Sequence, residues 1–407
     1  MASPVRPSSS REIDLLCALV RPQPDLLRAQ SLLRGAIDFP VFLELAQVHA
    51  VRPRLIQALS SLDWDGVPLS AKRELEAFRE SHVLRSLYLA EQQGNIADAL
   101  LAAGICFAFF KGATLAADLY GDLSWREYGD IDVIVMPHQV AQAERVLEDL
   151  DYLNRQGDPA FRRAFLASQR QYSFTRADIG ATVDLHWDFS AGQLPFPLRP
   201  EDAWGSLKGV RVGSRNMPTV SDENLALLLA GHGTKEAWRS LGWVCDFSIF
   251  VESAPGLDWA SLLVRARRRG SGNALLLGCA MARELLGTPV PGDLVKPLAS
   301  NKRVGRLVEQ LVEQMLGGIA TLQRPTPLMD IDLCDRRWDR VKAALSVVFT
   351  PTPGDYHARP LPAGLWWLYY LLRPLRLAAQ ALTPRRSPVD DRPGAGIGRP
   401  TPQHQTS

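Results

Sequence analysis

Two aspartates at alternate positions, Asp130 and Asp132, have the residue type and spacing best suited to chemistry. They begin the segment DIDVIV, which is otherwise apolar, as is typical of a strand buried in a covered sheet. Side chains at positions i and i+2 of a strand project from the same face. Two carboxylates about 4 Å apart repel each other by roughly 4 kcal/mol at an effective dielectric constant of about 20. A proton or a cation would relieve this repulsion, and Mg²⁺ prefers such oxygen ligands. The pair therefore indicates a metal site.

The preceding segment has features that could hold phosphate groups. The apolar residues Ile105–Phe110 predict a buried strand, which ends where Lys111 and Gly112 begin a helical pattern. Free N–H groups at a helix start attract anions, glycine lets phosphate oxygens approach the backbone, and lysine adds a positive charge. Arg126, four residues before the first aspartate, is a further candidate for a phosphate contact. The alternatives are an ion pair between Lys111 and one of the aspartates, and an exposed loop position for Arg126.

A third carboxylate, Asp184, lies in another short strand pattern, TVDLHW. The segments Gln171–Thr175 and Ala181–Trp187 predict a hairpin that brings this aspartate beside the first two, so that three carboxylates would surround the metal. Asp188 is the alternative third ligand, because it shares the strand face and lies nearer the end of the strand. His186 also shares this face, and it could act as a base or support a metal ligand. A structural histidine bonded to the backbone is the other interpretation.

Taken together, these segments resemble a known family. FKGATLA, YGD, REYGDIDVIV and VDLHWDF are similar to segments of the uncharacterised bacterial nucleotidyltransferase family, which belongs to the DNA polymerase β-like superfamily. The likeness extends to HGTKEAWRSLGWVCDFSIFV, FTPTPGDY and LPAGLWWLYYLLRPLRL, and so covers roughly Glu12 to Leu382. One departure is that Lys111-Gly112 stands where the superfamily usually has Gly-Ser.

The resemblance implies an α+β fold, in which a small mixed β-sheet nucleotidyltransferase core is flanked by N- and C-terminal helical regions. It implies that Asp130, Asp132 and Asp184 hold metal, with two Mg²⁺ ions expected. The enzyme would transfer NMP from an NTP, such as ATP, to a hydroxyl-bearing acceptor with release of pyrophosphate. A small molecule, a peptide and a protein all fit as acceptor. A catalytically weak or inactive nucleotide- or partner-binding protein is the alternative, because the Gly-Ser is missing.

The composition is that of an ordinary folded protein. Of 407 residues, 46% are hydrophobic and 22% are charged, and the net charge of +2 gives no electrostatic reason to expect nucleic-acid binding. The five cysteines are widely spaced and mostly lie in apolar segments, so we expect buried thiols in a reducing compartment. The N-terminus has no signal-peptide pattern, and no segment has the roughly 18 apolar residues of a spanning helix. We therefore predict a cytoplasmic protein.

The distribution of apolar residues divides the chain into five parts. Residues 1–10 and 383–407 are expected to be disordered. Residues 11–103 are expected to form an N-terminal helical region, 104–220 the nucleotidyltransferase core, and 221–382 a C-terminal helical region. The N-terminal region is expected to pack against the core.

Helices are predicted where apolar residues recur at intervals of three and four. They cover Glu12–Val20, Asp25–Gly35, Phe39–His49, Arg52–Leu62, Lys72–Ala103, Pro137–Leu150, Asp158–Arg170, Ser221–His232, Lys235–Val251, Trp259–Gly270, Ala274–Leu286 and Asn301–Leu316. Ser70 is expected to cap the helix that begins at Lys72. Three polar residues on apolar helices, His232, Lys235 and Asp246, could line the nucleotide or acceptor pocket or could be structural.

The most apolar segment, Leu365–Leu382, contains Arg373, Pro374 and Arg376, which argue against a membrane span. We interpret it as a helix that packs on the core, because aromatic stripes at helical spacing are usually buried. An interfacial helix with aromatic residues at a membrane surface is the alternative.

Overall fold

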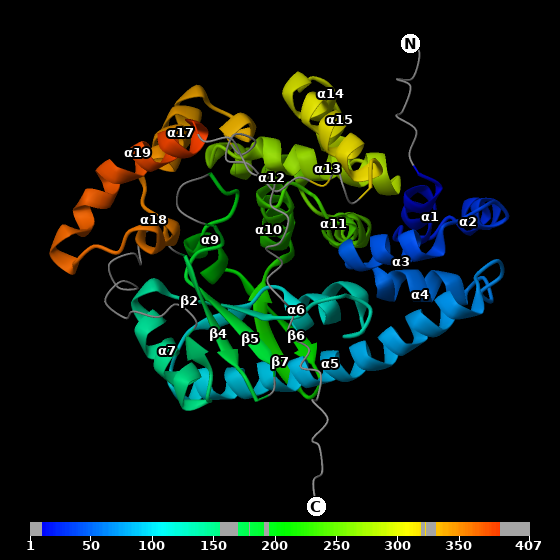
Figure 1. The fold of residues 1–407 in the computed structure, drawn as a ribbon, viewed down its shortest axis with the longest axis horizontal. Helices are drawn as coiled ribbons and strands as arrows, with labels where there is room; N and C mark the ends of the chain where they lie inside the picture. The colour runs from blue at the N-terminus through cyan, green and yellow to red at the C-terminus, as the bar shows by residue number, and fades with distance from the viewer. Residues whose placement is uncertain are drawn as a thin grey trace, which may run out of the picture.

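The acidic segment DIDVIV lies inside a five-stranded mixed sheet (Figure 1). The structure is a computed structural model that describes residues 10–154, 170–178, 180–190, 195–318, 322 and 331–382. The strands in spatial order are β1 (Phe107–Phe109), β2 (Ile131–Val135), β5 (Ala181–His186), β4 (Gln171–Arg176) and β3 (Leu153–Asn154). Helices precede and follow the sheet in the chain, so the fold is α+β, as the resemblance implied.

β2 is the strand on which the site depends, and it is buried along its whole length. It pairs antiparallel with β1 and parallel with β5, so that Asp132 lies opposite Asp184 and Ile134 lies opposite His186. Parallel pairing needs a long connection, which contains α7 (Val140–Asp149), β3 and β4. The predicted hairpin is confirmed, because β4 and β5 are antiparallel neighbours.

The long helix α5 (Leu69–Ala102) runs beneath the sheet in Figure 1. Its buried side chains join those of β1, β2, β4 and β5 in one hydrophobic core. The expectation that Ser70 caps this helix is wrong. The helix begins one residue earlier, at Leu69, because Pro68 takes the cap position in an extended conformation. A two-stranded ribbon of β6 (Leu207–Val212) and β7 (Arg215–Val220) lies beside β1 and contributes side chains to the same core. The short helix α9 (Pro200–Trp204) precedes this ribbon in the chain.

The helices before and after the sheet pack against each other. Those before it, besides α5, are α1 (Arg11–Leu19), α2 (Leu26–Leu33), α3 (Phe39–Val48) and α4 (Arg52–Ser60). Those after it include α10 (Asp222–Lys235), α11 (Leu241–Ser253), α12 (Trp259–Arg268), α13 (Gly272–Leu286), α14 (Gly292–Ala299) and α15 (Lys302–Leu316). One hydrophobic core joins both sets. In addition, the carbonyl of His49 accepts hydrogen bonds from Ser240 Oγ (2.7 Å) and Gly242 N (2.9 Å) at the start of α11.

The prediction of a single helix over Lys235–Val251 is wrong, because the chain turns between α10 and α11. Ala237 and Trp238 have left-handed backbone conformations, with φ of 55° and 49°, which an α-helix does not accommodate. The turn buries Trp238 completely against Phe247 of α11, with ring centroids 5.7 Å apart. Burial of this large side chain offsets the unfavourable backbone.

The described residues after residue 330 include a helical hairpin at one edge of the molecule (Figure 1). Its elements are α17 (Arg337–Phe349), α18 (Pro353–Ala358), the 3-10 helix η4 (Ala363–Leu368) and α19 (Tyr369–Leu382). The interpretation of Leu365–Leu382 as a core-packing helix is wrong for its outer face, since Leu371 and Leu375 are exposed. Within α19, Tyr369 and Arg373 are the buried members among the side chains that the structure describes. No helix in the described parts of the chain combines the length and apolar character needed to cross a bilayer.

The helix predicted over Asp158–Arg170 lies outside the described residues except for Arg170, and so do residues 1–9 and 383–407. The expectation of buried cysteines is correct for four of the five but wrong for Cys106, which is exposed. Cys106 immediately precedes β1, whose own three residues are buried, so the exposed position lies just outside the strand.

Candidate active site

The centre of the site is a cluster of Asp132, Asp184 and His186 on the neighbouring strands β2 and β5. The parallel register places the two aspartates side by side, and His186 follows Asp184 on the same strand face. One ligand atom from each of the three residues lies within 4.8 Å of the others. The structure therefore brings together two of the three predicted carboxylates and adds an imidazole to them.

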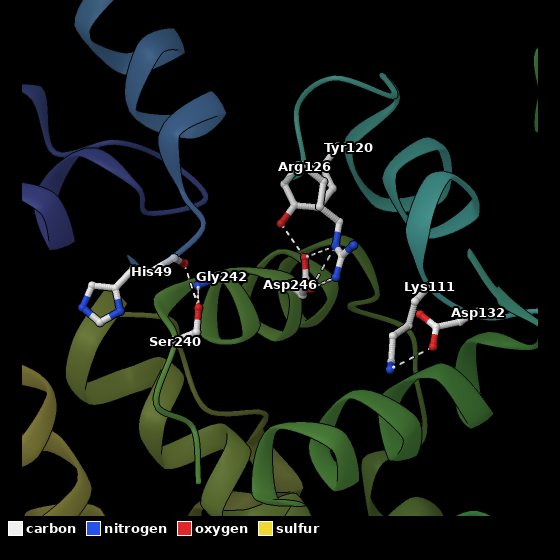
Figure 2. A network of polar contacts seen from close by, with 8 residues as sticks. All are labelled: His49, Lys111, Tyr120, Arg126, Asp132, Ser240, Gly242 and Asp246. Atoms are coloured by element: carbon white, nitrogen blue, oxygen red, sulfur yellow. Dashed lines mark hydrogen bonds and ion pairs between the residues drawn. The ribbon is translucent and has the colours of Figure 1, made fainter. Parts of the chain in front are cut away.

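Asp132 is almost completely buried and has two cationic or hydrogen-bonding partners. Its Oδ1 lies 3.0 Å from His186 Nε2 and 3.5 Å from Lys111 Nζ. Burial alone would raise the pKa of the Asp132 carboxyl, but the Lys111 charge and the His186 hydrogen bond overcome this and hold the pKa below its usual value. Asp132 is consequently an ionised carboxylate at neutral pH. Figure 2 shows Lys111 and Asp132 pointing toward each other.

Asp184 is oriented by two polar residues of the next strand, β4. Ser173 lies opposite Asp184 in the register and donates its hydroxyl to Asp184 Oδ1 (2.6 Å), while Gln171 Nε2 donates to Oδ2 (3.2 Å). Neither residue was predicted from the sequence. Their alternation with buried Tyr172 and Phe174 is the available signal, because it puts both polar side chains on the same face of β4.

Asp188, the alternative third ligand, has different surroundings. Its Oδ2 lies 3.7 Å from Arg170 Nε, and its Oδ1 accepts a hydrogen bond from the Phe189 backbone N–H (2.8 Å). It is not among the residues whose ligand atoms gather around Asp132 within the described part of the chain. Asp184 is thus the better placed of the two.

Asp130 lies just before β2, next to the cluster. Repulsion from Asp132, together with burial, raises the pKa of the Asp130 carboxyl to about 6. Asp184 acts in the same direction, while Lys111 opposes the shift. The raised pKa shows that negative charge at this point of the site is only partly balanced by the protein itself.

Gly112 begins the short helix α6 (Gly112–Leu115), which continues as a π-helix over Ala116–Tyr120. Its φ of +56° favours glycine, and a Cβ atom here would lie 3.1 Å from the carbonyl oxygen of Asp130. The glycine therefore lets the turn after β1 approach the acidic segment closely. Lys111 and Gly112 remain predicted phosphate contacts, and the structure places both beside the carboxylates.

Arg126 is held in a buried polar network that was not predicted from the sequence. Its Nε and one terminal nitrogen donate to the Asp246 carboxylate at 3.0–3.1 Å, and Tyr120 Oη donates to Asp246 Oδ1 at 2.7 Å (Figure 2). Burial would lower the pKa of Arg126, but Asp246 raises it above the usual value. The pair fixes the loop before Asp130 against α11. Arg126 is not an exposed loop residue, and it remains a predicted phosphate contact.

The last turn of α10 brings two more basic side chains toward the cluster. Burial and the charges of Lys111 and Lys235 hold the pKa of His232 well below its usual value. Burial, followed by the charge of Lys111, likewise lowers the pKa of Lys235. His232 packs edge-on against Trp243 at 5.5 Å. For Lys235, no ion pair or hydrogen bond of its ammonium group is found with the rest of the described chain. The side of the site toward α10 is therefore basic.

Comparison with known sequences identifies the family. Residues 35–287, more than half of the chain, match the sequence model of a family described as uncharacterised nucleotidyltransferase. The chain belongs to this nucleotidyltransferase family. No curated protein and no solved structure gives a significant match. The matched range runs from just before α3 to the end of α13, and is narrower than the Glu12 to Leu382 suggested by the resemblance.

Membership makes the chain a nucleotidyltransferase, for which an NTP is the implied substrate. The buried cluster of two aspartates and a histidine is compatible with this chemistry. The donor set also fits a divalent cation, because carboxylate oxygens and a neutral imidazole nitrogen are both ligands for such ions. The raised pKa of Asp130 is a second sign of fit, since a bound cation would balance the charge that raises it.

Proposed function

We propose that the nucleotidyltransferase is metal-dependent and transfers NMP from an NTP, with ATP among the candidates, to an acceptor hydroxyl with release of pyrophosphate. Asp130, Asp132 and Asp184 would hold two Mg²⁺ ions. The observation that carries the proposal is the register of the β2–β5 pair, which sets the carboxylates of Asp132 and Asp184 side by side, with the basic side chain of Lys111 3.5 Å from Asp132.

A divalent metal held by these carboxylates would supply positive charge to the triphosphate and would lower the pKa of an attacking hydroxyl. The protein supplies the rest. His186 keeps Asp132 ionised, and Ser173 fixes the direction of the Asp184 carboxylate. Lys111 and the backbone at Gly112 lie on one side of the carboxylates, and Lys235 and His232 interact with them from α10. We assign the β- and γ-phosphates to Lys111 and Lys235, whose positive charges complement phosphate oxygens, and to the backbone N–H groups at Gly112. His232, which is held neutral by its surroundings, can add a hydrogen bond but no charge.

A second candidate function is nucleotide binding without efficient turnover. Lys111 is already paired with Asp132 in this structure, at 3.5 Å, and it stands where the superfamily usually has glycine. A lysine held by a metal ligand contributes less to binding the triphosphate. Under this hypothesis NTP binds with Mg²⁺, but no acceptor is modified.

The test of transfer is a screen of α-labelled NTPs against cell extract with the wild-type protein and the Asp132→Asn variant. We expect label to move onto an extract component only with the wild-type protein. Asp65→Asn, an exposed aspartate in the turn before α5, is the matched control and should label normally. Normal labelling by Asp132→Asn would refute the assignment of the site.

A calorimetric titration separates the two functions. Enzymatic transfer predicts Mg²⁺-dependent NTP binding together with pyrophosphate release when the acceptor is present. Binding without pyrophosphate release, across sugars, peptides and proteins offered as acceptors, would favour the second function. Binding that does not depend on Mg²⁺ would contradict both.

A further inference from the structure

The C-terminal helix α19 has inverted polarity. Its charged side chains, Arg373 and Arg376, point inward and bind Asp355, with Nη1–Oδ2 and Nε–Oδ1 distances of 2.8 Å and 2.6 Å. Its outward residues are apolar: Leu371 and Leu375 are 58% and 67% exposed. The arrangement is the reverse of a helix that packs on a protein core and faces water. The outer face of α19 is therefore suited to contact with an apolar partner other than the core of this protein.

The neighbouring helix α17 shows a matching apolar stripe. Trp338, Val341, Leu345 and Val348 recur at intervals of three and four, and all four are exposed. At 3.6 residues per turn they fall within an arc of about 100°. Ala343, the buried residue of this helix, lies on the opposite side. Since α17 and α19 pack together as a hairpin at the edge of the molecule (Figure 1), both exposed faces belong to one unit.

The surroundings of the apolar faces are basic. Residues 336–379 contain seven Arg and Lys and only two Asp. One of these aspartates, Asp355, is buried and neutralised by its arginines. Arg337 and Lys342 are exposed and flank the apolar stripe of α17. Exposed aromatic residues are also present, including Trp367 and Tyr370. Tryptophan, tyrosine, arginine and lysine around an apolar face are typical of proteins that lie in a membrane interface.

We propose that the α17–α19 hairpin is a docking surface for a membrane that contains anionic phospholipids. Leu371, Leu375 and Trp367 would enter the boundary between headgroups and acyl chains, and Arg337 and Lys342 would contact the headgroup phosphates. Charge favours this partner over a second copy of the chain, because two such basic faces repel each other while an anionic bilayer attracts them. The surface lies outside residues 35–287, the range that matches the nucleotidyltransferase family, and it shares no residue with the candidate active site.

Co-sedimentation with vesicles tests the proposal on the full chain. We expect binding to vesicles of phosphatidylglycerol and phosphatidylcholine, much weaker binding to pure phosphatidylcholine, and a loss of binding as salt is added. The double variant Leu371→Glu/Leu375→Glu should bind at least about tenfold more weakly, and Arg337→Gln/Lys342→Gln should lose the preference for anionic lipid.

Leu27→Glu is the matched control, because Leu27 is 82% exposed on α2, far from the hairpin (Figure 1). It should bind vesicles as the wild-type protein does. Circular dichroism should show that all variants keep the wild-type helix content, since the substituted side chains are exposed. Failure of the wild-type protein to sediment with anionic vesicles overturns the proposal, as does equal binding by the leucine double variant. A dimer in light scattering that Leu371→Glu/Leu375→Glu converts to a monomer, without lipid binding, would assign the face to a second copy.

Discussion

Replacement of Asp130 by Asn should stabilise the metal-free protein. The pKa of Asp130 rises from 3.8 to about 6 because Asp132 repels it and because it is buried. At about 1.4 kcal/mol per pKa unit, ionisation of Asp130 in the folded state costs roughly 3 kcal/mol. Asn has nearly the same shape and no charge, so Asp130→Asn removes this cost. This figure already includes the attraction of Lys111, which opposes the rise of the pKa.

The sign of the pH dependence follows from proton binding. The folded state holds the Asp130 proton more tightly than the unfolded state, so the free energy of unfolding falls as the pH rises from about 4 to above 6. Asp130→Asn should lack this fall. The stability difference between the variant and the wild-type protein should therefore be largest near neutral pH. At about pH 5 it should be roughly half as large, and below about pH 4 it should vanish.

The assay is urea unfolding in a chelating buffer at two pH values, followed by the same measurement with Mg²⁺. A bound cation should stabilise the wild-type protein more than the variant, because it uses the Asp130 charge. The stability advantage of Asp130→Asn over the wild-type protein should then become smaller or change sign when Mg²⁺ is present. If Asp130→Asn is no more stable than the wild-type protein at neutral pH without metal, the repulsion between Asp130 and Asp132 is not the dominant interaction. Asp65→Asn, which changes an exposed aspartate, controls for the loss of one negative charge.

Three further variants test the groups around the carboxylates. Ser173→Ala removes the hydroxyl that orients Asp184, and should raise the apparent Kd for Mg²⁺ about tenfold by calorimetry while leaving the fold unchanged. Lys235→Ala should raise the Kd for NTP about tenfold, whereas Lys296→Ala, at an exposed position of α14, should not change it. Asp246→Ala leaves Arg126 buried without its partner and should lower the free energy of unfolding by about 3–5 kcal/mol in urea. The double variant Arg126→Met/Asp246→Ala should be more stable than Asp246→Ala alone, and an equal or lower stability would show that Asp246 acts by other contacts.

Local patterns in the sequence were sufficient to predict the elements that carry the carboxylates. The alternation of Gln171–Thr175 and Ala181–Trp187 around a short turn specified the β4–β5 hairpin, because period-two apolar spacing and a turn sequence are both local. The apolar run after Asp130 likewise specified β2. The adjacency of Asp132 and Asp184 followed once these strands were placed side by side. Their assignment as metal ligands remains a prediction.

Contacts between distant parts of the chain could not be predicted in this way. Arg126 and Asp246 are 120 positions apart, and nothing in either local sequence specifies that they pair. The turn between α10 and α11 was missed because the backbone there is set by burial of Trp238 in a core built from several helices. The exposure of the outer face of α19 was not predicted for a related reason. An apolar helix is usually buried, but the ion pairs of Arg373 and Arg376 orient the charged face of α19 inward. These ion pairs depend on Asp355, which lies 18 and 21 positions earlier in the chain.

The topology of the sheet also sets the order in which the chain can assemble. The β4–β5 hairpin closes a short turn, while pairing of β2 with β5 joins residues more than 50 positions apart, as in the contact of Asp132 with His186. Closing the longer loop costs more entropy, so we expect the hairpin to form first and β2 to dock later. In a partly folded chain, Asp132 of β2 would then stay apart from Asp184 of β5. The two like charges would approach each other only after the β4–β5 hairpin, with its hydrogen bond from Ser173 to Asp184, has formed.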